Sequence, residues 1–127
     1  MKKIINTPNA PAPVGPYNQA TLYQGVLYVS GQIAIDPATN ALIQDSIEAE
    51  THQVMKNLQA ILTEAGLSFE NVLKCSVFVK DMNLYSRINA IYTTYFNEAT
   101  APARELVEVA NLPKFVNIEI SLIAAAA

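Results

Sequence analysis

Hydrophobic residues recur at two spacings along the chain, and each spacing predicts a different kind of element. A period of two is typical of strands with one buried face. It predicts strands over 4–5, 72–80, 104–109 and 116–123, and a hairpin of two strands over 18–33. The turn of this hairpin is expected at Gln24-Gly25, because glycine adopts the backbone conformations that tight turns require.

A period of 3.6 residues predicts two helices. The first begins near Asp45 or Ser46, since Asp45 and Glu48 have the spacing of a capping box, and it ends at Gly66. The second extends from about 83 to 97. Their buried stripes are expected to consist of Ile47, Val54, Leu58, Ile61, Leu62 and Ala65 in the first helix, and of Leu84, Ile88, Ile91, Tyr92 and Tyr95 in the second. Tyr85 and Phe96 are interpreted as further core residues.

The order of these elements is strands, helix, strand, helix, strands. Four prolines in the first sixteen residues exclude a helix there. No low-complexity linker interrupts the pattern, so we expect one domain over 1–127, of the α+β class, with two helices on one face of a mixed six-stranded sheet. The other face of that sheet needs cover, which predicts an oligomer.

Composition supports a packed protein with little solubilising charge. Hydrophobic residues make up 51% of the 127 residues, and charged residues make up 15%, against about 25% in typical domains. The net charge is −3. A negative chain lacks the positive surface that binds phosphate backbones, so nucleic acid is not expected as a partner.

One cysteine and one histidine leave few routes to a disulfide or a metal site. Cys75 lies in an alternating apolar strand and is expected to be a buried structural thiol, whereas His52 is expected to be a solvated surface residue without a role. The first residues lack the apolar segment of a signal peptide, and no run approaches the length of a membrane span. We therefore expect a cytoplasmic protein with no metal and no membrane contact.

The last two strands carry the most informative charged pair. If they form an antiparallel hairpin centred between Asn111 and Pro113, Arg104 lies opposite or diagonal to Glu119, within reach of such long side chains. The pair would then offer an anion anchor beside a candidate base, which suits a small substrate with its own carboxylate. A simple cross-strand salt bridge is the alternative interpretation.

Five groups of residues carry a resemblance to a known family. They are Gly15-Pro16-Tyr17; Ser30-Gly31-Gln32; Val77-Phe78-Val79-Lys80-Asp81; Asn89 with Tyr92 and Phe96; and Pro102-Ala103-Arg104 with Val107–Pro113 and Ile118-Glu119-Ile120. In order and at compatible spacing, they resemble the RidA (YjgF-type) reactive intermediate/imine deaminases over nearly the whole chain.

The resemblance implies a chorismate-mutase-like α+β fold assembled as a homotrimer with clefts between subunits. It implies hydrolysis of 2-aminoacrylate-type enamines and imines, made by pyridoxal-phosphate-dependent dehydratases, to 2-keto acids and ammonia, with no cofactor. Arg104 would hold the substrate carboxylate and Glu119 would activate water. The implied substrate-binding residues are Tyr17, Ser30, Gly31, Asn89 and Leu106.

Two positions depart from the family pattern. Glu105 and Leu106 stand where many relatives have a small residue followed by cysteine. Leu106 is expected to make the cleft more apolar, and Glu105 is expected to add negative charge near the cleft. Two other functions stay open: an endoribonuclease or translation inhibitor, as reported for similar members, and a non-catalytic sensor that binds 2-keto or amino acids.

Overall fold

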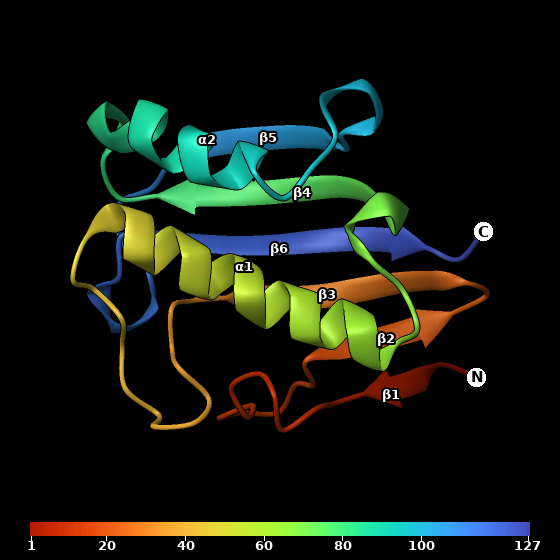
Figure 1. Ribbon diagram of the computed structural model, residues 1–127. Helices are drawn as coiled ribbons and strands as arrows, with labels where there is room; N and C mark the ends of the chain where they lie inside the picture. Colours follow the sequence, from red (N-terminus) through yellow and green to blue (C-terminus); the bar gives the residue numbers. More distant parts are fainter.

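The computed structural model describes residues 1–127, which form six strands and two α-helices (Figure 1). The strands are β1 (Lys3–Ile5), β2 (Ala20–Tyr23), β3 (Val26–Gln32), β4 (Val72–Val79), β5 (Ala103–Glu108) and β6 (Ile118–Ala125). The helices are α1 (Ile47–Glu64) and α2 (Tyr85–Thr93). The predicted α+β class and the six predicted strands are confirmed. Neither helix combines the length and the hydrophobicity that a membrane span requires.

All six strands form one sheet in the order β1-β2-β3-β6-β4-β5. Neighbouring strands are antiparallel except β4 and β5, which are parallel because α2 carries the chain back between them. β6 lies between β3 and β4, so the predicted hairpin of the last two strands is wrong. Their connection holds a 3-10 turn at Pro113–Phe115, with Lys114 and Phe115 at positive φ, and it crosses from the sheet edge to the sheet centre (Figure 1).

Helix α1 begins where the sequence predicted, but a different residue caps it. The Ser46 hydroxyl oxygen accepts a hydrogen bond from the backbone N–H of Ala49 at 3.0 Å, which satisfies a donor of the first turn. The predicted capping box of Asp45 and Glu48 does not form, because the Glu48 carboxylate binds α2 instead. Gly66 follows the helix with a φ of 76°, the left-handed conformation that favours glycine after a helix.

Helix α2 ends at Thr93, four residues before the predicted end at 97. The hydroxyls of Thr93 and Thr94 donate to carbonyl oxygens within the last turn, at 2.6 and 2.7 Å, and such bonds compete with continued helix. Asn97 caps the following 3-10 turn instead of closing the helix. Tyr95 still packs against the core, so the apolar stripe predicted burial correctly and the helix end incorrectly.

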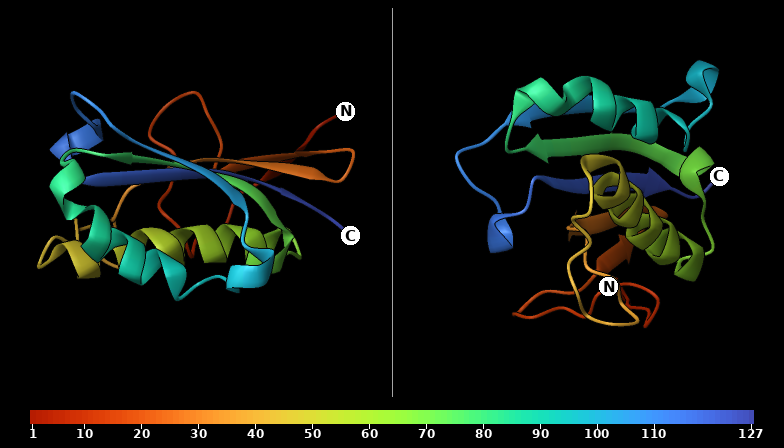
Figure 2. Two further views of the ribbon diagram at one scale, coloured as in Figure 1. Left: turned by 90° about the horizontal axis from the view of Figure 1, so that it is seen from above. Right: turned by 60° about the vertical axis from the view of Figure 1, so that its left-hand side comes forward.

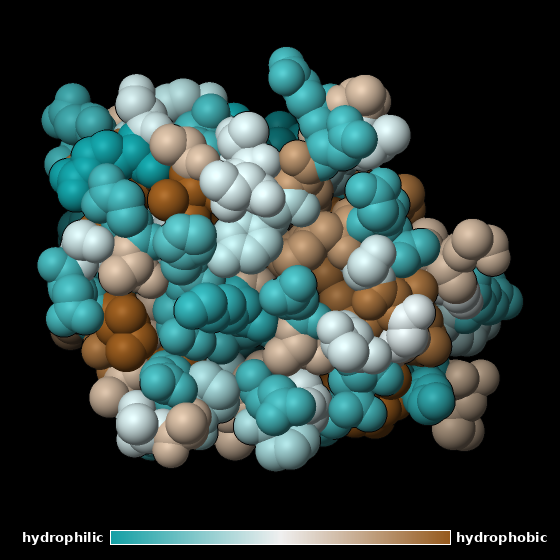
Figure 3. All heavy atoms as spheres, viewed as in Figure 1, coloured by the Kyte–Doolittle hydropathy of each residue, from teal (hydrophilic) through white to brown (hydrophobic).

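Both helices lie on the same face of the sheet (Figure 2). Between them and the sheet lies a core of 22 buried residues, which includes Ile118, Ile120 and Leu122 of β6. Seen from the helix side, hydrophilic and hydrophobic residues are interspersed on the surface (Figure 3). As predicted, no helix covers the opposite face, where Tyr28 and Val107 stay 50% and 43% exposed.

Strand β4 lies inside the sheet and carries the single cysteine. Cys75 is fully buried, as predicted, and burial raises the pKa of its thiol. Leu73 stands two residues before Cys75, so the period of two over 72–80 places it on the same apolar face, but it is 53% exposed. A register shift between Val72 and Lys74 turns it outward.

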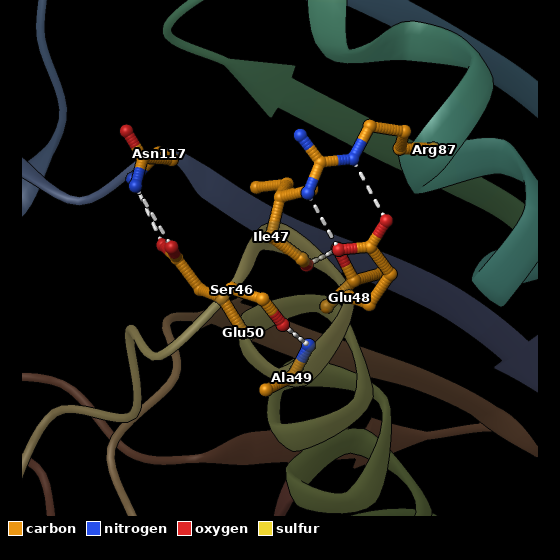
Figure 4. A network of polar contacts seen from close by, with 8 residues as sticks. Ser46, Ile47, Glu48, Ala49, Glu50, Arg87 and Asn117 are labelled. Carbon is orange, nitrogen blue, oxygen red and sulfur yellow. Dashed lines mark hydrogen bonds and ion pairs between the residues drawn. The ribbon is translucent and has the colours of Figure 1, made fainter.

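The first turn of α1 is bonded both to α2 and to the start of β6 (Figure 4). The Glu48 carboxylate accepts two hydrogen bonds from Arg87, both of 2.7 Å, which lower the pKa of Glu48 to about 2. The Glu50 carboxylate, which is 1% exposed, accepts from the backbone N–H and the side-chain amide of Asn117 at 2.9 and 2.8 Å. Asn117 precedes Glu119 by two residues. The first turn of α1 therefore holds two segments that carry predicted site residues: α2, which carries Asn89, and the start of β6, which carries Glu119.

Candidate functional site

Arg104 lies on the helix-covered side of edge strand β5. It pairs with Cys75 of β4, and paired residues on neighbouring strands point to the same face. Its Nη1 donates to Asn89 Oδ1 at 2.7 Å, and its Nη2 donates to the Tyr85 hydroxyl at 2.9 Å. The guanidinium carbon also lies 4.9 Å from the ring centre of Tyr92, at cation–π distance. Side chains of α2 therefore hold the guanidinium in place, and we call these four residues the arginine cluster.

The arginine cluster borders an open cavity of about 440 Å³, which Asn89, Tyr92, Pro102 and Arg104 help to line. Only two of the guanidinium N–H groups are engaged by Asn89 and Tyr85. Because an arginine carries five donors in a planar fork, the others can bind an anion. This geometry matches a carboxylate in particular.

Glu119 lies on the uncovered side of the sheet. It pairs with Phe78 of β4, and its half-buried position raises the pKa of its carboxyl because desolvation disfavours the charged form. Gly31 allows this position: a Cβ added there would lie 2.7 Å from Glu119 Oε2. Only glycine leaves room for the carboxylate at this place.

A second cavity, of about 220 Å³, contains the Glu119 carboxylate in its lining together with Tyr17, Gly31 and Lys114. Ser30 lines an adjoining hollow that also includes Tyr17, and its hydroxyl donates to a backbone carbonyl at 2.6 Å. The structure thus gathers four predicted site residues, which we call the glutamate cluster: Tyr17, Ser30, Gly31 and Glu119.

Strand β4 separates the two clusters. Arg104 pairs with Cys75 and Glu119 pairs with Phe78, three positions further along β4. Successive residues of a strand point to opposite faces, so the two side chains point to opposite faces of the sheet. The prediction that they converge on one pocket of the same chain is therefore wrong, and the alternative salt bridge between them does not form either.

Glu105 and Leu106 take opposite sides of β5. Glu105 lies on the uncovered face, where the Ser76 hydroxyl donates to it at 2.7 Å and the Lys74 ammonium lies 3.5 Å away. Both contacts lower the pKa of Glu105. Glu105 and Arg104 therefore point to opposite faces of the sheet, and the expectation that Glu105 adds negative charge near the cleft stays a prediction. Leu106 lies on the same side as Arg104 and packs against the core.

Tyr85 and Tyr92 contribute to the arginine cluster in a way that the sequence did not predict. Tyr92 is buried as expected, which raises the pKa of its phenol, and its hydroxyl has no hydrogen-bond partner. Tyr85, in contrast, is 37% exposed. Tyr85, Asn89 and Tyr92 follow one another at spacings of four and three, which places them on one helix face. This spacing could have identified the cluster.

His52 lies outside both clusters. The prediction that His52 is a solvated surface residue is wrong, because its Nδ1 lies 2.8 Å from the hydroxyl of Tyr95 and the two rings meet edge to face. No group of three or more histidine, cysteine, aspartate or glutamate side chains is placed to hold a metal ion.

Comparison with known proteins identifies the family. The family model described as Endoribonuclease L-PSP matches residues 7–126. A RutC family protein of Synechocystis is 55% identical over 96% of this chain and 95% of that protein. The 2-iminobutanoate/2-iminopropanoate deaminase of Salmonella typhimurium is 47% identical over 98% of each chain. The crystal structure of E. coli TdcF with bound serine superimposes with a TM-score of 0.92 at 38% identity, covering 98% of this chain and 99% of that chain. The chain has the chorismate-mutase-like α+β fold and belongs to the Rid/YjgF/L-PSP (RutC) family.

Proposed function

We propose that this protein is a deaminase that hydrolyses reactive 2-imino acids and their enamine tautomers, such as 2-aminoacrylate, to 2-keto acids and ammonia. The observation that carries the proposal is the arginine cluster, in which Asn89 and Tyr85 fix the Arg104 guanidinium while leaving donors for a carboxylate. The name of the Salmonella relative, a 2-iminobutanoate/2-iminopropanoate deaminase, supports the same substrate class.

A complete site in this proposal needs two chains. Since Arg104 and Glu119 lie on opposite faces of one sheet, the partner of each must come from a neighbouring copy. Two different surfaces then meet, and such heterologous contacts form a ring when the rotation between copies closes. We propose a homotrimer in which the arginine cluster of one chain meets the glutamate cluster of the next. The uncovered face, with Tyr28 and Val107 exposed, offers apolar surface for this assembly.

The proposed chemistry uses water as the nucleophile and no cofactor. An enamine first takes a proton on carbon to become the protonated imine, whose carboxylate Arg104 holds. Glu119 accepts a proton from water while the water oxygen bonds to the imine carbon, and its raised pKa makes the carboxylate a stronger base. Glu119 then returns this proton to nitrogen and takes the proton of the new hydroxyl as the C–N bond breaks, so that ammonia leaves and the carbonyl of the 2-keto acid forms.

The other predicted site residues fall on the two walls of this cleft. Tyr17, Ser30 and Gly31 would line the wall that carries Glu119. Asn89 and Leu106 would line the wall that carries Arg104. A fixed substrate and a fixed water are the main requirements, because an imine conjugated to a carboxylate is already electrophilic.

The description of the matching family model favours a second candidate, an endoribonuclease. The net charge of −3 opposes it, because RNA binding relies on clustered basic side chains. Purified protein that fails to bind or cleave RNA at both low and high salt would remove this candidate.

A non-catalytic sensor would instead bind 2-keto or amino acids without turnover.

The test couples the protein to a pyridoxal-phosphate-dependent dehydratase that generates 2-aminoacrylate from serine, with pyruvate release followed in time. We expect the protein to accelerate release above the spontaneous rate and Arg104→Ala to abolish the acceleration. Arg87→Ala is the matched control, since Arg87 is the other arginine of the chain and pairs with Glu48 instead. A wild-type rate equal to the spontaneous rate would reject the proposal.

A further inference from the structure

The Tyr85 hydroxyl occupies a place that core packing does not explain. Tyr85 is the first residue of α2 and is 37% exposed, so its hydroxyl could point into solvent. Instead it lies 2.9 Å from Nη2 of Arg104, and its ring centre lies 5.7 Å from the guanidinium carbon. The tyrosine therefore belongs to the surroundings of the charged group.

The direction of this hydrogen bond leaves the hydroxyl proton unused. A guanidinium has only donors, whereas a phenol oxygen can accept and can also donate one proton. Tyr85 must therefore accept from Arg104, and its hydroxyl makes no other hydrogen bond. Its own proton is free to bind an acceptor placed next to the guanidinium.

The two other α2 residues of the arginine cluster contribute differently. Asn89 offers its Oδ1 to Nη1. The hydroxyl of Tyr92 is buried, and only its ring meets the guanidinium. Tyr85 is thus the one aromatic residue of the cluster that presents an exposed, unused donor beside the guanidinium.

We infer that the Tyr85 hydroxyl is a substrate contact: it accepts from Arg104 and donates to the same carboxylate that Arg104 holds. A carboxylate has about four acceptor positions, so it can take a guanidinium fork and a phenol together. This inference rests on the proposed function, and it names Tyr85 as a residue that sets the preference for ligands with a carboxylate.

The experiment measures pyruvate binding by calorimetry in the wild type, Tyr85→Phe and Tyr95→Phe. The two variants lose the same atom from the same residue type, but the Tyr95 hydroxyl bonds His52 instead of the arginine cluster. We expect Tyr85→Phe to weaken pyruvate binding about tenfold, as for a hydrogen bond to a charged group, and Tyr95→Phe to leave it unchanged. In the coupled assay, Tyr85→Phe should raise KM by a similar factor while kcat stays the same, the sign of lost ground-state binding.

The inference and the proposed function can fail separately. Equal pyruvate affinity in Tyr85→Phe and the wild type, or a fall in kcat with unchanged KM, would overturn the inference even if the wild type is an active deaminase. A tenfold weaker affinity in Tyr85→Phe would support it even if the wild type shows no turnover, in which case the proposed function alone fails. A wild type that does not bind pyruvate would overturn the inference.

Discussion

The arginine cluster and the glutamate cluster prepare their charged groups in opposite ways. Arg104 is held by hydrogen bonds and by an aromatic ring, all from one helix, so the direction of its guanidinium is fixed. Glu119 has no hydrogen-bond partner among the protein side chains; it is set by close approach of Gly31 and by desolvation. The orientation of Arg104 suits the carboxylate binding that we propose, and the raised pKa of Glu119 suits the proposed proton transfer.

The difference extends to the placement of the clusters. The arginine cluster lies on the helix-covered side at an edge strand, whereas the glutamate cluster lies on the side that no helix covers. Each cluster is well formed within one chain. In the proposed function, the two clusters are the two halves of one site, so the proposed chemistry depends on how copies of the chain meet.

The largest expected effect comes from filling the space between Gly31 and Glu119. Gly31→Ala places a Cβ against the carboxylate and must displace it. A displaced catalytic group loses about 100-fold in rate, so kcat in the coupled assay should fall by about this factor. Pyruvate binding should change by much less than this factor, because in the proposed two-chain cleft the arginine cluster of the neighbouring chain holds the ligand carboxylate, whereas the added Cβ meets Glu119.

Gly15→Ala is the matched control for this change. Its added Cβ would lie 3.5 Å from the Tyr17 ring, an ordinary contact, so activity should stay close to that of the wild type. A Gly31→Ala enzyme with wild-type kcat would remove Glu119 from the chemistry.

A smaller effect concerns the α1 turn that supports both clusters. Glu50→Ala leaves the backbone N–H and the side-chain amide of Asn117 without their partner, which should lower the free energy of unfolding by about 2 kcal/mol. Glu48→Ala should lower it less, because the ion pair with Arg87 is exposed and screened by solvent. Urea denaturation measures both, and an equal loss in the two variants would contradict this account of the turn.

The smallest expected effect concerns the protonation of Glu119. A carboxyl whose pKa is raised on folding binds protons more tightly in the folded state, so its contribution to stability is present below the unfolded pKa and is lost as pH rises through the folded pKa. Glu119→Gln should therefore be more stable than the wild type at neutral pH, and the difference should vanish in acid. Thermal unfolding of the wild type and of Glu119→Gln from acid to neutral pH tests this expectation. A variant that is less stable than the wild type at neutral pH would contradict it.

Local patterns in the sequence predicted most of the fold. The alternation of β6 and the stripe of α1 placed buried residues correctly, since burial of one face decides both patterns. The end of α2 was missed because Asn97 can close one helix or cap the next turn, and only tertiary contacts decide between them.

The site could be predicted residue by residue but not as an arrangement. The charge pattern of the last two strands and the family resemblance both pointed to Arg104 and Glu119, and each side chain has defined neighbours in the structure. The assumption that the last two strands are neighbours failed because strand order is set by long-range packing: β6 inserts between β3 and β4, and α2 returns the chain to the far edge. β4 lies between the two strands that carry Arg104 and Glu119. The sheet face to which each side chain points depends on the pairing register with β4, and no local sequence pattern encodes this register.

The most direct test of the two-chain site mixes two inactive variants. Arg104→Ala keeps an intact glutamate cluster, and Glu119→Ala keeps an intact arginine cluster. When equal amounts are unfolded together and refolded, random assembly of a ring gives intact clefts at about one in four interfaces. We expect the mixture to recover about a quarter of wild-type deaminase activity, with each variant inactive alone. No recovery, from a mixture shown by mass spectrometry to contain hybrid oligomers, would contradict it.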